Sequence, residues 1–165
     1  MKPASNIAFK EWASVCEAIA AGKQTIILRK GGIHEGDEGF QPEHAGFWLY
    51  PTQFHQTPDD LSIEGVPFLE LAQEHIPEDN TIVLRTFVSV SKVDYVTDET
   101  RLDDYREQHI LSDIVVHRRF HYKQPGLYIL HVTASSLETP LVLPFDYSYA
   151  GCHTWVELTQ AVETP

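Results

Sequence analysis

The sequence contains no run approaching ~18 consecutive apolar residues, so we expect no membrane-spanning helix and no membrane partner. Residues 1–6 lack the apolar core of a secretory signal, which predicts that the protein is not secreted. Only two cysteines are present, Cys16 and Cys152, and they lie far apart in the chain. A disulfide scaffold is therefore not expected, and reduced thiols in a cytoplasmic protein are the simpler interpretation.

Several signatures of catalysis and metal binding are also absent. The chain has no G-x-S-x-G, H-E-x-x-H, C-x-x-C or G-x-G-x-x-G pattern. These absences argue against the common hydrolases, zinc metalloproteases, zinc fingers and dinucleotide enzymes. We therefore predict no cofactor, no metal and no catalytic residues, and we favour a non-enzymatic role.

What the chain does have is enough apolar sequence for a core and an uneven distribution of charge. Its 165 residues, 42% of them hydrophobic, predict a single domain over residues 1–165. The net charge is −12, yet residues 31–80 hold eleven acids and no Lys or Arg. Basic residues concentrate at 23–30 and 118–123. These two basic segments are either solvated surface or parts of one anion-facing patch, and the pattern fits both.

The first half of the chain predicts two helices and two short strands. Apolar residues at spacings of three and four predict a helix over residues 6–21, ended by Gly22. Strands are expected at 25–28 and at 47–50, where Pro51 should stop the second one. The remaining expected elements are loops over 33–44 and 56–65 and a helix from Pro67 to about His75.

The second half is richer in strands. The alternation of Ile114–Tyr122, followed by a Pro125-Gly126 turn, predicts a hairpin over 114–133. The other expected elements are a strand over 81–96, a helix over 98–110, a strand at 141–143, and a strand or helix at 155–158. Together these elements predict an α+β fold with two to three helices and either a mostly antiparallel sheet or a partly closed β-barrel.

Polar residues near the strand ends are candidates for ligand binding. Two glycines after Arg29-Lys30 would let backbone N–H groups approach an anion, although a tight turn with solvated charges gives the same pattern. Tyr50, His55 and Gln56 could bind a polar ligand or satisfy their own loop. The candidate ligand-binding residues are Arg29, Lys30, His34, Tyr50, Thr52, His55, Gln56, Arg119, Tyr122, Tyr149, Cys152 and Trp155.

Two further patterns do not indicate a metal site or a nucleophile. On the predicted strand, His117 and His121 would lie about 13 Å apart, so they could not share a metal ion. Cys152 stands beside His153, but nothing near them in sequence supplies the rest of a catalytic or zinc-binding set. A small buried residue is the simpler interpretation of this cysteine.

Several motifs carry a resemblance to a known family when they are taken together. In chain order they are residues 9–13, 28–33, 49–52 with His55-Gln56, Arg119-Phe120 with Tyr122, Tyr149 with Gly151-Cys152, and 155–158. This combination resembles the bacterial family called domain of unknown function 1802, over almost the whole chain. Relatives are joined to Mrr-type restriction-endonuclease domains, so the resemblance implies a part in restriction–modification or DNA defence. It implies no catalytic residues.

A second resemblance concerns the opening of the chain. Residues 18–25, with Gly22-Lys23 and Thr25 ahead of a strand, are similar to the start of ASCH domains. That similarity implies a PUA-like β-barrel that binds nucleic acids or modified bases.

These observations predict a non-catalytic binding module for nucleic acid or a modified nucleotide. Its basic segments would contact phosphate, and Tyr50, His55 or Trp155 would stack on a base. An alternative is an interaction domain that docks a protein partner through the acidic block at residues 35–79. A metal-assisted hydrolase using His34, Glu35 and His55 is the less favoured alternative, and the oligomeric state stays open.

Overall fold

An α+β fold is built on one sheet whose strands come from both ends of the chain. The computed structural model describes residues 2–30 and 44–165. Its strands are β1 (Ala4–Trp12), β2 (Ile26–Arg29), β3 (Gly46–Thr52), β4 (Thr81–Val96), β5 (Leu127–Pro144) and β6 (Trp155–Glu163). Its α-helices are α1 (Ala13–Ala20), α2 (Val66–Glu74) and α3 (Asp113–His121). Short 3₁₀ helices are η1 (Pro58–Asp60), η2 (Ile63–Gly65), η3 (Glu99–Gln108) and η4 (Tyr147–Tyr149).

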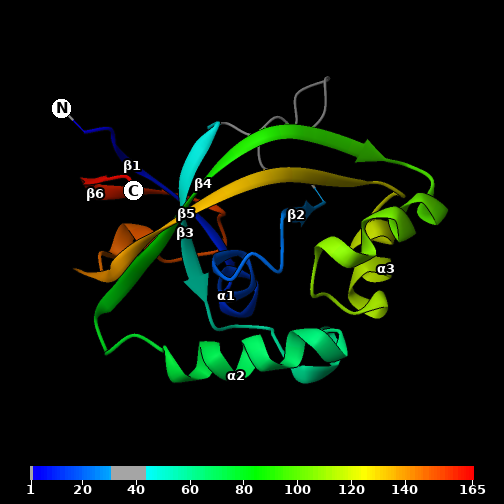
Figure 1. Ribbon diagram of the computed structural model, residues 1–165, viewed down its shortest axis with the longest axis horizontal. Helices are drawn as coiled ribbons and strands as arrows, with labels where there is room; N and C mark the ends of the chain where they lie inside the picture. Colours follow the sequence, from blue (N-terminus) through cyan, green and yellow to red (C-terminus); the bar gives the residue numbers. More distant parts are fainter. Residues whose placement is uncertain (1, 31–43) are drawn as a thin grey trace.

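The described strands form a six-stranded sheet in the order β2-β5-β4-β3-β1-β6. Only β1 and β3 pair in parallel, and the other neighbours are antiparallel. The long strands β4 and β5 arch across the top of Figure 1, with α3 at one end and β1, β6 and both termini at the other. The prediction of an α+β fold with a mostly antiparallel sheet is confirmed.

The sheet curls strongly, so its β2 edge approaches β1 although three strands separate them in the sheet. The guanidinium of Arg29 at the end of β2 contacts Lys10 and Glu11 of β1. Inside the curl, side chains from β1, β2, β3 and β5 pack with α1 and α3 as one apolar core, in which Phe9, Ile27 and Phe120 are buried. A smaller core around Trp48 and Tyr149 covers the other face.

The first half of the predicted helix at 6–21 is wrong, because Ala4–Trp12 form β1 and only Ala13–Ala20 are helical. Ala8 and Phe9 are both fully buried, since β1 lies between β3 and β6 and is covered on both faces. A strand covered on both faces loses its alternation, and its apolar run then resembles a helix. Gly22 does follow the helix end with a φ of +76°, a conformation that glycine adopts without strain.

The predicted hairpin over 114–133 is also wrong, because Asp113–His121 form α3. Ser112 caps this helix, its hydroxyl accepting a hydrogen bond from the Val115 N–H. Val116 and Phe120 are buried four residues apart, a spacing that fits a helix as well as the strand that we expected. The helix brings the ring centroids of His117 and His121 to 4.3 Å from each other. The expected separation of about 13 Å on a strand is therefore wrong.

The remaining elements follow the sequence with smaller differences. Pro51 does not stop β3, because β4 pairs with β3 only as far as Trp48 and leaves the strand without a neighbour on that side. Residues 141–143 belong to β5 instead of forming their own strand. The strand at 81–96 and the helix after Pro67 are confirmed. Most of the loop expected at 33–44 lies outside the described residues. No helix in the described ranges is long and apolar enough to cross a membrane.

Candidate ligand-binding site

Charged and aromatic side chains from β1, β2 and α3 meet where the curled sheet brings these elements together. We call Glu11, Trp12, Arg29 and Arg119 the arginine–glutamate cluster. The Glu11 side chain is only 2% exposed, and its Oε2 lies 3.5 Å from Nη2 of Arg29. The same guanidinium donates a hydrogen bond to the Lys10 carbonyl. A buried carboxylate is thus paired with a cation from the opposite edge of the sheet.

Arg119 adds a second guanidinium to this cluster from α3. Its guanidinium carbon lies 4.8 Å from the centre of the Trp12 ring, and Nη1 donates to the Leu28 carbonyl at 3.1 Å. Burial lowers the pKa of Arg119; the negative charge of Glu11 opposes this shift, and the positive charge of Arg29 adds to it. Two cations therefore surround one carboxylate, so the cluster has a net positive charge in a protein of charge −12.

Local structure explains why Glu11 stays in place at the junction of β1 and α1. Its Oε1 accepts a hydrogen bond from the Trp12 N–H at 2.8 Å, and its carbonyl accepts one from the Thr52 hydroxyl at 3.2 Å. Gln56 supports the same junction, because its Oε1 accepts from the Ser14 N–H and hydroxyl at the start of α1. Thr52 and Gln56, both predicted ligand residues, thus hold the cluster's backbone.

Among the described residues, two buried donors beside the cluster have no hydrogen-bond partner. They are Nε of Arg29 and Nε1 of Trp155. Both groups pack on Phe9: the Arg29 guanidinium lies 4.5 Å from the centre of that ring, and the Trp155 ring meets it edge-on at 5.0 Å. Trp155 also meets Phe47 and His44 edge-on. Buried donors are nearly always satisfied in native proteins, so this pair marks a place where an acceptor from a ligand could bind.

Lys10 and Tyr50 lie beside the cluster on the adjoining strands β1 and β3. The Lys10 ammonium donates to the Gly151 carbonyl at 2.9 Å and lies 5.8 Å from the centre of the Tyr50 ring. Partial burial lowers the pKa of Lys10, and burial also raises the pKa of Tyr50. Tyr149 packs edge-on against Tyr50 but is a core residue, 1% exposed, whose hydroxyl donates to that of Thr159.

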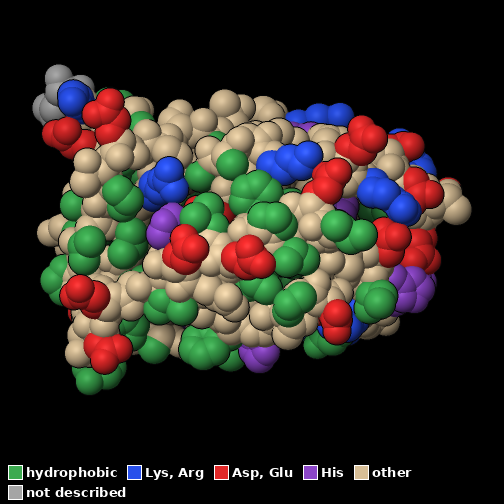
Figure 2. Space-filling model, turned by 60° about the horizontal axis from the view of Figure 1, so that its bottom comes forward, with side chains coloured by type: hydrophobic (Ala, Val, Ile, Leu, Met, Phe, Trp, Pro, Cys, Tyr) green, Lys and Arg blue, Asp and Glu red, His purple; other side chains and the backbone are tan. Residues whose placement is uncertain are grey.

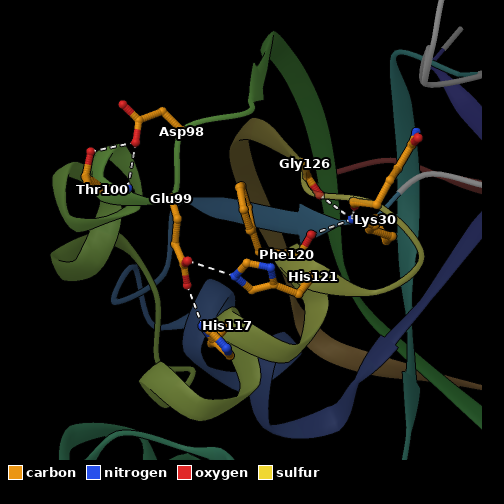
Figure 3. A network of polar contacts seen from close by, with 9 residues as sticks. Lys30, Asp98, Glu99, Thr100, His117, Phe120, His121 and Gly126 are labelled. Atoms are coloured by element: carbon orange, nitrogen blue, oxygen red, sulfur yellow. Dashed lines mark hydrogen bonds and ion pairs between the residues drawn. The ribbon is translucent and has the colours of Figure 1, made fainter.

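The two basic segments do meet in the fold, and three of their cations, Arg29, Lys30 and Arg119, bind backbone carbonyls. Figure 3 shows Lys30 reaching the end of α3, where Nζ donates to the carbonyls of Phe120 and Gly126. The same ammonium also donates to the Gln124 carbonyl. These contacts hold α3 against β2. The two segments therefore converge through the hydrogen bonds of Lys30 and Arg119, while Arg118 and Lys123 are exposed.

The other predicted residues are exposed or lie outside the described residues. His55 adopts a φ of +66° in the exposed loop after β3. Tyr122 is exposed. Cys152 is exposed as well, so its interpretation as a small buried residue is wrong. His34 is not among the described residues. The sequence analysis did not predict Lys10, Glu11 and Trp12 as site residues. Their place in the motif at residues 9–13, one of those that carry the family resemblance, was the signal that could have identified them.

A separate groove of about 500 Å³ lies between α1, β3, the end of α2 and the strands β4 and β5. Glu17 is its charged centre, with His75 Nδ1 at 2.7 Å and Arg85 Nη1 at 3.6 Å. Figure 2 brings the α2 side forward and shows hydrophobic side chains over much of this face with acidic groups between them. Among the described acids of the 35–79 block, Asp60 binds Thr57 and Glu64 pairs with Lys23.

Comparison with known proteins identifies a family but no protein of known activity. The family model described as a domain of unknown function (DUF1802) matches residues 8–165. None of the curated proteins matches the chain.

Similar solved structures include three of ASCH from Zymomonas mobilis. Its structure has a TM-score of 0.49 and 15% identity, covering 86% of this chain and 73% of that one. The structure of its tyrosine-to-phenylalanine variant has a TM-score of 0.48 and 14% identity, with 86% of this chain and 75% of that one covered. The structure of its serine-to-alanine variant has a TM-score of 0.47 and 14% identity, with 85% of this chain and 73% of that one covered.

Proposed function

This chain belongs to the DUF1802 family, and we propose that it is a non-catalytic binding module for nucleic acid or a modified nucleotide, with the arginine–glutamate cluster beside its binding site. The observation that carries the proposal is the pair of unpartnered donors on Arg29 and Trp155. Leaving such a donor buried costs about 1–3 kcal/mol, and that cost disappears when a ligand supplies an acceptor.

The chemistry around these donors suits a nucleobase. Base edges carry carbonyl and ring-nitrogen acceptors, and arginine is the side chain that most often binds them in pairs. Trp155 and the nearby Phe9 and Phe47 rings provide apolar surface for a flat, aromatic ligand. Base–aromatic contacts contribute about 1–3 kcal/mol each in single-strand binding proteins.

The charges favour few phosphate contacts. Arg29 pairs with Glu11 and Arg119 binds a backbone carbonyl, so with Lys10 the site offers at most three cations for phosphate. Each phosphate contact on duplex DNA contributes a slope of about −0.9 to the dependence of log affinity on log salt. We therefore expect a slope no steeper than about −3. Recognition through the base, not through the backbone, follows from this balance.

A wider role in restriction–modification or DNA defence belongs to the same proposal and rests on the family resemblance. Such a role requires the module to distinguish modified from unmodified DNA. The base-binding site proposed beside Arg29 and Trp155 would make that distinction.

The test is fluorescence anisotropy of the full chain with labelled single-stranded, duplex and modified-base oligonucleotides over a salt series. We expect binding with the shallow salt slope given above and a preference for the modified base. Absence of binding to every oligonucleotide at low salt would overturn the proposal. Docking of a protein partner through the acidic 35–79 block would then be the function to test.

A further inference from the structure

A second cluster, apart from the arginine–glutamate cluster, brings three metal-ligating side chains together where η3 meets α3. Glu99 is the first residue of η3, and His117 and His121 are one helical turn apart on α3. One ligand atom from each residue lies within 4.8 Å of the other two, and all three side chains are solvent-accessible. At the end of the molecule where α3 lies, Figure 2 shows histidine beside acidic side chains.

The two imidazoles already point at one carboxylate, as Figure 3 shows. Nδ1 of His117 lies 2.5 Å from one oxygen of Glu99, and Nε2 of His121 lies 2.8 Å from the other. Three donors thus converge with no rearrangement of the backbone.

The backbone on both sides of this cluster is held by other contacts. Asp98 caps η3, because its carboxylate accepts from the N–H and hydroxyl of Thr100 at 3.0 and 2.7 Å. Lys30 binds the carbonyls of Phe120 and Gly126 at the end of α3. The donor atoms are therefore presented from two fixed elements, and only side-chain torsions need to change when a ligand enters.

We propose that Glu99, His117 and His121 form a binding site for a divalent transition-metal ion, with Zn²⁺ as the reference ion. Two imidazoles and one carboxylate are donors that suit Zn²⁺, Ni²⁺ and Cu²⁺, whereas Ca²⁺ and Mg²⁺ sites are built from oxygen. Two donors on one Zn²⁺ lie at most about 4.2 Å apart, twice the usual bond length, so small side-chain rotations close the site. The exposed side of the site leaves room for water ligands.

The experiment is isothermal titration of the full chain with zinc chloride in a buffer that does not bind zinc. We expect one Zn²⁺ per chain, and at least about tenfold weaker binding in each of His117→Ala, His121→Ala and Glu99→Gln. The positions are exposed, and alanine is the strongest helix former, so these variants should fold, which circular dichroism checks. His153→Ala and Cys152→Ser serve as matched controls and should bind like the wild type.

Two results would overturn this site. One is a wild-type chain that takes up no zinc, which would leave the cluster as a set of ion pairs between η3 and α3. The other is zinc binding that is lost in Cys152→Ser or His153→Ala but kept in the three cluster variants. Histidine ring resonances of the wild type give a second readout that needs no variant, and zinc should shift those of His117 and His121 before any others.

Discussion

His109 provides a buried titratable group whose protonation opposes folding. It follows η3, its side chain is nearly inaccessible, and its Nδ1 accepts a hydrogen bond from the Leu111 N–H at 3.1 Å. Burial lowers the pKa of His109 to about 4; nearby Asp113 opposes the shift, and Arg106 and Arg119 add to it. The folded protein therefore holds this imidazole neutral under conditions in which the unfolded chain would protonate it.

The sign and size of the effect follow from the two pKa values. Folding lowers the pKa of His109 from its ordinary value of 6.5 to about 4. The stability that the neutral imidazole contributes is therefore complete above about pH 6.5 and is lost as the pH falls toward 4. At pH 5 the unfolded state gains about 2 kcal/mol from protonating this histidine, while the folded state gains almost nothing.

His109→Asn isolates that contribution. An asparagine oxygen can accept the N–H two residues ahead, as the imidazole does, but it does not titrate. We expect the free energy of unfolding, measured by urea denaturation, to fall between pH 7.5 and pH 5 by about 2 kcal/mol more in the wild type than in the variant. His153→Asn, at an exposed histidine, should retain the wild-type pH dependence. Equal losses in the wild type and His109→Asn would refute the assignment.

Two further predictions concern the arginine–glutamate cluster and the end of α3. Glu11→Gln leaves Arg29 without its buried counter-charge and should lower the free energy of unfolding by about 3 kcal/mol, so an unchanged urea midpoint would contradict the pairing. Lys30→Met keeps the apolar stem but removes the donor to three carbonyls, with an expected loss of about 2 kcal/mol by the same assay. A Lys30→Met chain as stable as the wild type would show that these contacts add nothing.

The fold class could be predicted from local sequence patterns, and the misassigned elements have a common physical cause. Strand β4 alternates over its first half and was predicted to its exact bounds. Residues 6–12 and 114–121 were misassigned because the spacing of their apolar residues fits both the helical period and the strand period. For β1, burial on both faces by β3 and β6 decided the outcome, and for α3 the Ser112 cap did. The pairing partners of a strand and the burial of its faces are tertiary properties, and the spacing of apolar residues in the sequence does not encode them.

The candidate site could be predicted only in part for a related reason. Arg29 and Arg119 were candidates because they are basic residues near predicted strand ends. Their common partner Glu11 was not, since nothing local marks a carboxylate that the curl of the sheet buries. The zinc-site proposal depended even more on structure, because the wrong assignment of residues 114–122 as a strand placed His117 and His121 too far apart.

Base binding beside Arg29 and Trp155 is tested by the affinity of Trp155→Phe for a modified-base oligonucleotide, compared with the wild type and with Tyr147→Phe at an exposed aromatic residue. Phenylalanine keeps an aromatic ring against Phe9 but lacks the unpartnered Nε1 donor, so the urea midpoint should change little. We expect the wild type to bind, the affinity to fall about fivefold or more in Trp155→Phe, the equivalent of about 1 kcal/mol, and Tyr147→Phe to bind like the wild type. Equal affinities of Trp155→Phe and the wild type would contradict base binding at the Trp155 donor.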